Sequence, residues 1–249
     1  MRFSWVFVGL LYLVACATQP VEETKEYRIA DTNVRLAVGY MQQGRLDDAL
    51  VKLKKALEAI PDYKDAHSAI ALVYDHLGKY DLASEHYKKA IKLDPDNGLV
   101  YNNYGVFLCT QNRLKEAEEY FMLAVQKPRY ATPERAYENA GACAKKIPDN
   151  EKAEIYLRKA LTINPKLPLA LYTMAQITYE QKRYMSTRAY LQRFEDVSEH
   201  TAESLWLGIE VERQLGNKEA EEHYSKLLQT RFPDSLELKK LLDTSRGGN

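Results

Sequence analysis

The sequence predicts an all-α protein: a right-handed superhelical solenoid of about six helix pairs, closed by a short C-terminal capping helix. Two observations predict this fold. Equivalent residues recur 34 positions apart, as Ala49 and Ala83 do, and as Pro61 and Pro95 do. Each unit also carries two segments with apolar residues at helical spacing, separated by a turn. A repeat of this length is typical of stacked helix pairs, whose product is a curved binding surface.

Each unit is predicted to form a helix, a tight turn, a second helix and a stop. Small residues at its eighth and twentieth positions allow the two helices to approach closely, and large apolar residues fill the space between them. A proline near the end lacks a backbone donor and terminates the second helix. This pattern resembles the tetratricopeptide repeat. The predicted repeats cover residues 30–63, 64–97, 98–131, 134–167, 168–200 and 201–234, followed by a cap over 235–243 and a disordered tail over 244–249.

Three irregularities interrupt the repeats. Asn112 stands where repeats one and two have a turn glycine, and Thr187 stands where the other repeats have a small alanine. Two extra residues, Thr132 and Pro133, precede repeat four. We expect this insertion to shift the register between repeats three and four by two residues.

Residues 1–15 are predicted to be a lipoprotein signal peptide. The apolar run from Phe3 to Leu13 has about eleven residues, too few to cross a bilayer as a helix. Leu13-Val14-Ala15-Cys16 follows and resembles the bacterial lipobox, in which the cysteine receives a diacylglycerol and the preceding peptide is removed. The alternative is an ordinary signal peptide that happens to contain a cysteine. Alanine at position 17, where aspartate would favour retention in the inner membrane, implies export to the outer membrane.

Residues 16–29 are predicted to be the lipidated N-terminus and a polar, flexible tether. Several acyl chains anchor a protein more strongly than one, since each buried CH₂ contributes roughly 0.8 kcal/mol. The predicted localisation is therefore the outer membrane, with the protein held by its lipid on the inner leaflet and facing the periplasm.

Composition and motifs argue against several classes of function. Lys plus Arg and Asp plus Glu both number 35, so no net charge favours nucleic acid. The five histidines have no metal-binding spacing, and no nucleophile motif, phosphate-binding loop or dinucleotide fingerprint occurs. We therefore expect no enzymatic activity, metal, cofactor or small-molecule substrate. An enzyme regulator or hydrolase on a repeat scaffold is the alternative, and a catalytic triad in the structure would support it.

Two cysteines remain once Cys16 is lipidated. Cys109 and Cys143 fall on the first helices of repeats three and four, which lie side by side in this architecture. An oxidising periplasm permits a disulfide between them, and closing a loop of this size stabilises a fold by roughly 3–4 kcal/mol in the entropy model. We favour the disulfide; the alternative is two buried free thiols.

The concave side of the solenoid is the predicted partner site. In tetratricopeptide repeats, positions two, five, nine, twelve and thirteen of the first helix tend to line that side, and here they are largely apolar in the first three repeats. The predicted partner-binding groove residues are Val34, Val38, Met41, Leu72, Leu99, Asn102, Asn103 and Val106. Repeat four adds a charged wall that includes Arg135, Glu138 and Lys145. An apolar strip beside amides suits an extended or helical peptide; alternatively, some of these side chains pack against neighbouring repeats.

One segment makes the resemblance to a known family specific. Residues 101–109 read YNNYGVFLC, and Asn139-x-Gly141-x-Cys143 follows in the next repeat. With the lipobox and six repeats, this segment resembles the PilF/PilW family of type IV pilus biogenesis lipoproteins, over the whole chain. The resemblance implies a pilotin, which binds subunits of the pilus secretin at the outer membrane and promotes their multimerisation. Pilus biogenesis and twitching motility depend on this step.

An alternative function within the binding-protein class remains. A tetratricopeptide scaffold lipoprotein of another envelope pathway, such as outer-membrane protein insertion or cell-wall synthesis, would show the same leader and repeats. Such scaffolds lack paired cysteines at this spacing. The expected partners are thus the secretin and, through the lipid, the inner leaflet of the outer membrane.

Overall fold

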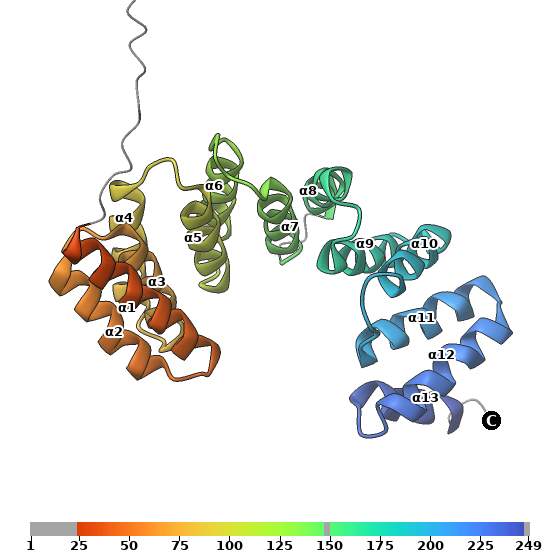
Figure 1. Ribbon diagram of the computed structural model, residues 1–249. Helices are drawn as coiled ribbons and strands as arrows, with labels where there is room; N and C mark the ends of the chain where they lie inside the picture. The colour runs from red at the N-terminus through yellow and green to blue at the C-terminus, as the bar shows by residue number, and fades with distance from the viewer. Residues whose placement is uncertain (1–23, 147–149, 247–249) are drawn as a thin grey trace, which may run out of the picture.

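The computed structural model describes residues 24–146 and 150–246. Within these ranges the chain forms thirteen α-helices and no strand (Figure 1). The helices are α1 (Lys25–Gln42), α2 (Leu46–Ala59), α3 (Lys64–His76), α4 (Tyr80–Leu93), α5 (Gly98–Thr110), α6 (Leu114–Val125), α7 (Pro133–Ala144), α8 (Asn150–Ile163), α9 (Pro168–Glu180), α10 (Tyr184–Glu195), α11 (Ala202–Leu215), α12 (Lys218–Arg231) and α13 (Leu236–Arg246).

Six antiparallel helix pairs, α1 with α2 through α11 with α12, stack along the chain, and α13 packs on the last pair. The prediction of an all-α solenoid with a capping helix is thereby confirmed. The pairs curve into an arch, with α1–α4 in one arm and α9–α13 in the other (Figure 1). The first helices of the late pairs, α9 and α11, lie on the inner side of their arm (Figure 1).

The turns inside the pairs use one residue with a left-handed backbone. In the described turns these residues are Gly44, Gly78, Asn112, Lys182 and Gly216, with φ between 58° and 72°. Asparagine tolerates this conformation better than most side chains do, so Asn112 replaces glycine at little cost. Repeat five keeps the same turn with a lysine, although its sequence is the most degenerate of the six.

Small residues at the eighth position of each unit set the distance within a pair. A Cβ added to Gly105 would lie 2.7 Å from the Phe121 ring, and one added to Gly141 would lie 2.5 Å from the Leu157 side chain. Real Cβ atoms do not approach so closely, so glycine is required where a large side chain of the second helix fills the interface.

Both ends of the solenoid extend further than the sequence predicts. Helix α1 begins at Lys25, inside the predicted tether, because Thr24 Oγ1 accepts a hydrogen bond from the backbone N–H of Tyr27 and caps the helix. The Tyr27 ring then packs edge-on against Tyr63. Helix α13 continues to Arg246, so residues 244–246 of the predicted tail are helical. The predicted signal peptide and Cys16 lie outside the described residues.

Candidate partner-binding surface

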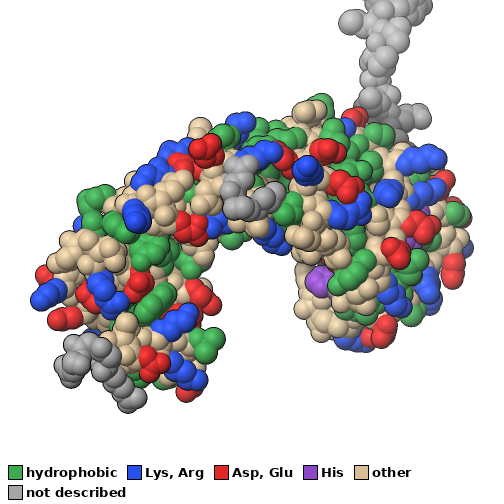
Figure 2. All heavy atoms as spheres, turned by 180° about the vertical axis from the view of Figure 1, so that it is seen from behind, with side chains coloured by type: hydrophobic (Ala, Val, Ile, Leu, Met, Phe, Trp, Pro, Cys, Tyr) green, Lys and Arg blue, Asp and Glu red, His purple; other side chains and the backbone are tan. Residues whose placement is uncertain are grey.

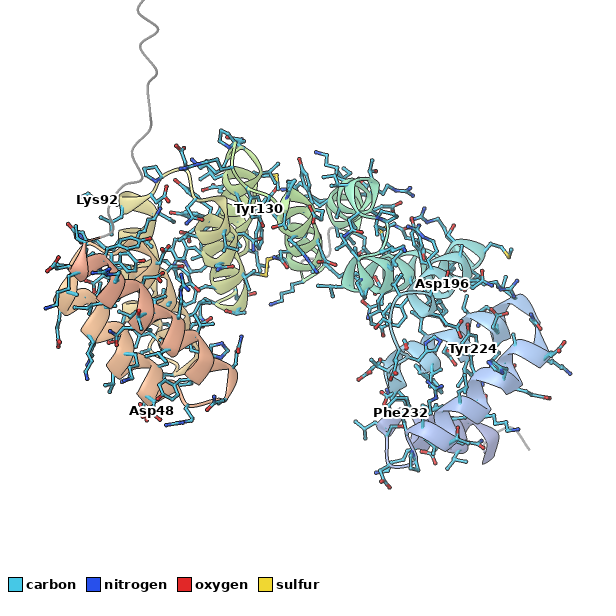
Figure 3. The ribbon with its side chains drawn as sticks, in the orientation of Figure 1. Asp48, Lys92, Tyr130, Asp196, Tyr224 and Phe232 are labelled. Carbon is cyan, nitrogen blue, oxygen red and sulfur yellow. A yellow bond between two sulfur atoms is a disulfide. The ribbon has the colours of Figure 1, made fainter. Side chains whose placement is uncertain are left out.

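Helices α5 and α7, the first helices of repeats three and four, are cross-linked. The structure joins Cys109 and Cys143 in a disulfide with a Cα–Cα distance of 5.9 Å (Figure 3, yellow bond). The Asn139 side-chain amide donates to Asn102 Oδ1 at 3.0 Å, and Lys146 Nζ donates to the Cys109 carbonyl at 3.2 Å. These three links fix the middle of the concave face in one geometry.

The predicted role of Asn102 in the groove is wrong. Its side chain is buried, and its amide oxygen is occupied by Asn139 of the next repeat. A position that the repeat pattern assigns to the groove is therefore covered by the neighbouring repeat, as is the equivalent Glu138 of repeat four. Asn103 is half-exposed and is the amide that remains available.

The six apolar residues of the predicted groove fall into two groups. Val34, Met41 and Leu72 are half-buried and pack against the core clusters of the first three repeats. Val38, Leu99 and Val106 remain exposed, at 43%, 54% and 37% of their surfaces. The surface available to a partner is therefore narrower than predicted, and we call these three residues the N-terminal apolar face.

Two carboxylates on α3 belong to the same concave side. Burial raises the pKa of both Asp65 and Asp75 above the ordinary aspartate value. Within the described part of the chain, neither forms an ion pair, whereas Asp31 on α1 pairs with Arg35 at 2.8 Å. Asp65 is exposed, with Lys64 nearby but bound to Asp94, and Asp75 is half-buried, so both carboxylates gain from a cation that a partner brings.

The charged wall predicted for repeat four consists of structural contacts. Glu138 is buried, and its carboxylate accepts hydrogen bonds from Arg135 Nη1 and from the backbone N–H of Ala170, each at 3.0 Å. Ala170 lies in the first turn of α9, where backbone donors have no helical partner. Lys145 pairs with Glu180 of the next repeat at 2.6 Å. Glu138 and Lys145 thus join repeats four and five, whereas Arg135 remains half-exposed.

One arrangement looks like a catalytic triad. His200 Nδ1 lies 3.0 Å from Ser204 Oγ, and His200 Nε2 lies 3.6 Å from Glu195 Oε1. The Ser204 side chain is 1% exposed, and its hydroxyl also bonds both backbone groups of Thr201 as part of the α11 capping box. A nucleophile that serves as a helix cap and is closed off from solvent has no path to a substrate.

The described residues contain neither a candidate membrane-spanning helix nor a candidate metal site. In residues 24–146 and 150–246, no helix has the length and apolar character needed to cross a bilayer. The same part of the chain holds no group of three or more histidine, cysteine, aspartate or glutamate side chains arranged to bind a metal ion.

Fold and surface define a tetratricopeptide-repeat binding scaffold. Models of the tetratricopeptide repeat match residues 40–75, 65–97, 86–119 and 134–167. The type IV pilus assembly protein PilF of Pseudomonas aeruginosa is 33% identical over 242 residues, which cover 95% of this chain and 96% of that protein. The chain therefore belongs to the PilF family of type IV pilus biogenesis proteins.

Two solved structures agree with this assignment. The structure of Pseudomonas aeruginosa PilF superposes with a TM-score of 0.81 and 32% identity, covering 89% of this chain and all of that one. The crystal structure of PilW, a widely conserved type IV pilus biogenesis factor, gives a TM-score of 0.78 and 31% identity, covering 86% of this chain and 99% of the other.

One exposed apolar residue on α9, a first helix of the C-terminal arm, was not among the predicted groove residues. Leu169, at the second position of repeat five, is 47% exposed. The same position rule that selected Leu99 in repeat three selects Leu169, so the signal was present in the sequence.

Proposed function

We propose that this protein is a pilotin: a lipid-anchored protein that binds subunits of the type IV pilus secretin and promotes their multimerisation at the outer membrane. Membership of the PilF family supports a role in type IV pilus biogenesis. The observation that carries the binding role is the N-terminal apolar face: Val38, Leu99 and Val106 are exposed on α1 and α5, at positions that the repeat pattern assigns to the concave side.

The chemistry of this face indicates which segment of a partner it binds. Covering exposed apolar surface contributes about 25 cal/mol per Å², so a partner with apolar side chains gains from filling the concave side. Asp65 and Asp75 lie on α3 among the same first helices, without ion pairs in the described residues. A secretin segment that combines apolar side chains with a lysine or arginine fits both features.

The proposed pilotin role includes a lipid anchor on Cys16 and no enzymatic activity. Lipidation of Cys16 would hold the solenoid at the inner leaflet of the outer membrane, where secretin subunits assemble. The buried, capping Ser204 supports a binding role over a hydrolytic one. The proposed protein acts through its surface and carries no cofactor.

The proposal is tested by charge substitutions on the concave side. Val38→Asp and Val106→Asp should each abolish the heat-resistant secretin multimers seen by gel electrophoresis. Truncating or charging a central anchor residue typically costs over 2 kcal/mol of binding free energy. Gln126→Glu, an exposed change at the C-terminal end of α6, is the matched control and should leave multimers intact. The circular-dichroism signal and melting temperature should stay near wild type in all three.

Cys16→Ala tests the anchor in the same cells. It should remove labelling by radioactive palmitate and reduce the multimers in the outer-membrane fraction. Folded Val38→Asp and Val106→Asp proteins that support full multimers would refute the binding site, and equal palmitate labelling of Cys16→Ala would refute the lipid.

A further inference from the structure

The C-terminal arm has an inner surface of its own. Its members come from three helices that follow one another along that arm, α9, α11 and α13 (Figure 1). We define the C-terminal face as Leu169, Tyr172, Gln176, Glu203, Trp206 and Glu237. Seen from behind, the inner side of this arm shows hydrophobic side chains among both acidic and basic ones (Figure 2).

Aromatic and aliphatic side chains form the apolar part of this face. Leu169 is 47% exposed at the start of α9. Tyr172, one turn later, is half-buried and packs against Phe194, with ring centroids 5.7 Å apart. Trp206 on α11 is half-buried against the core cluster of repeat six and α13. Half-buried tyrosine and tryptophan side chains held rigidly by a core are the residue types that most often anchor protein partners.

The charge on this face is negative. Burial raises the pKa of Tyr172, and the negative charges of Glu203 and Glu237 raise it further, while a hydrogen bond with Gln176 lowers it. In the part of the chain that the structure describes, Glu203 forms no ion pair, and the Lys240 ammonium is 3.8 Å from Glu237. Nearby Arg213 is already bound by Glu210 at 2.7 Å and Glu221 at 2.9 Å.

Aromatic rings beside carboxylates favour a cationic partner. A lysine or arginine gains from the ring face and from the carboxylate together. An anionic lipid surface is disfavoured, because it would meet Glu203 with a like charge. Apolar neighbours such as Leu169 favour a chain that also presents aliphatic side chains, in the manner of a peptide laid along the first helices of a repeat array.

We propose that the C-terminal face is a second docking site, which binds a segment of a partner protein that alternates apolar residues with lysine or arginine. The site is separate from the N-terminal apolar face and does not depend on the secretin being its ligand. Two docking sites on one arch would allow the protein to hold two segments at once, which increases the effective concentration of each.

Trp206 provides a direct readout. The chain has two tryptophans, and Trp5→Phe leaves Trp206 as the only tryptophan even in unprocessed protein, so excitation at a tryptophan-selective wavelength in non-ionic detergent reports on Trp206. The probes are short synthetic peptides: one alternates leucine and lysine, a second leucine and glutamate, and a third serine and lysine. The leucine–lysine peptide should change Trp206 emission and bind at least about tenfold more tightly than the other two, a difference of about 1.4 kcal/mol.

Substitutions on the face and away from it locate the binding. Leu169→Ser and Glu203→Lys should each weaken the leucine–lysine peptide about tenfold or more. Ile163→Ser, at an exposed position at the end of α8, and Glu222→Lys, at an exposed position of α12, are the matched controls and should bind as wild type. Circular dichroism checks that all four variants fold.

Three outcomes would overturn the proposal: equal binding of the leucine–glutamate peptide, wild-type binding by Leu169→Ser and Glu203→Lys, or loss of binding in Val38→Asp alone. The last result would assign the peptide to the N-terminal apolar face. Secretin multimers measured in the same variants separate the two proposals, because Val38→Asp tests the pilotin role while Leu169→Ser tests the second site.

Discussion

The junctions on the two sides of repeat three are built from different chemistry. Between repeats two and three, aromatic rings carry the contact: Tyr87 lies 5.2 Å from Tyr104 and 5.6 Å from Phe107, centroid to centroid. Two polar contacts between side chains accompany them: the hydroxyls of Ser84 and Tyr104 hydrogen-bond at 2.9 Å, and Arg129 lies 3.7 Å from Asp94.

Between repeats three and four, directional bonds dominate. The Cys109–Cys143 disulfide and the Asn139–Asn102 hydrogen bond join the first helices. On the second helices, Glu118 accepts from Lys152 Nζ at 2.6 Å and from the Tyr156 hydroxyl at 2.5 Å. The same repeat spacing thus accommodates an apolar junction on one side and a covalently and polar-linked junction on the other.

This difference bears on the concave side. The burial of apolar ring surface is non-directional and tolerates small rotations of one repeat against the next. A disulfide and a hydrogen bond between two side-chain amides specify one geometry. The junction between repeats two and three separates Val38 on α1 from Leu99 and Val106 on α5. We therefore expect the spacing of the N-terminal apolar face to depend on the aromatic junction, while the disulfide-linked centre serves as the rigid reference.

The largest effect should come from the aromatic junction itself. Tyr104 is fully buried among Tyr87, Phe107 and Tyr120. Tyr104→Ala removes a large core side chain and should lower the free energy of unfolding by about 3–5 kcal/mol. Tyr80→Ala, at an exposed position of the same junction, should cost about 1 kcal/mol or less. Urea unfolding measures the free energy of unfolding of both variants. Equal decreases in Tyr104→Ala and Tyr80→Ala would contradict the role assigned to ring packing.

The next effect should come from the disulfide. Replacing both Cys109 and Cys143 with alanine should lower the free energy of unfolding by about 2–4 kcal/mol. A reductant should destabilise the wild-type protein by a similar amount and leave the double variant unchanged. Thiol counting on the denatured, unreduced protein checks the bond directly. Two reactive thiols at these positions after export to the periplasm would show that the pair is free.

Sequence predicts the repeats well because their determinants are local and periodic. Gly105 and Gly141 are required by a helix pair that each repeat builds from its own residues, and Asn112 replaces a turn glycine without needing distant contacts. The repeat period is therefore sufficient to locate the helix pairs along the chain. The type IV pilus family could be suggested in the same way, from a segment around Cys109.

The groove was harder to predict because exposure depends on neighbouring repeats. Asn102 satisfies the position rule for the concave side, but Asn139 of the next repeat donates to its side chain and Asn102 is buried. Glu138 satisfies the same rule and instead supplies acceptors to the first turn of α9. Thr24 was assigned to a tether because its capping bond and the packing of Tyr27 on Tyr63 are visible only in three dimensions.

The smallest effect concerns repeat two itself, where a histidine pair joins α3 and α4. His67 Nε2 donates to the carbonyl of Pro61 at 3.1 Å, so its Nδ1 accepts from His86 Nδ1 at 3.0 Å. Burial lowers the pKa of both histidines, and Lys89 opposes protonation of His67 while Asp62 and Glu85 favour it. Protonating both rings would place two cations against each other.

The direction of the pH dependence follows from these pKa values. The unfolded chain binds protons on histidine near pH 6.5, whereas the folded pair resists them, so the free energy of unfolding should fall as the pH drops below about 6.5. Each pKa unit of difference corresponds to about 1.4 kcal/mol. Paired carboxylates such as Asp94 and Glu154, whose pKa values are lowered, lose their stabilising effect only below about pH 4.5. Asp65 and Asp75, whose pKa values burial raises, are present in every variant compared below, so a difference between variants from pH 7 to pH 5 reports the histidines.

A matched pair of variants separates this histidine pair from the other titrating groups. His86→Gln should flatten the fall in stability between pH 7 and pH 5, because glutamine can still donate to His67 and carries no charge. His76→Gln, at an exposed position of the same repeat, should keep the wild-type slope, and His200, whose pKa burial also lowers, contributes equally to both variants.

Hydrogen exchange at the two pH values should show α3 and α4 opening more at pH 5, while α5 and α7 stay protected, since neither a disulfide nor an amide pair titrates there. Parallel slopes for His86→Gln and His76→Gln would show that the pair does not control the pH response, and the aromatic junction would then be the weaker link at every pH.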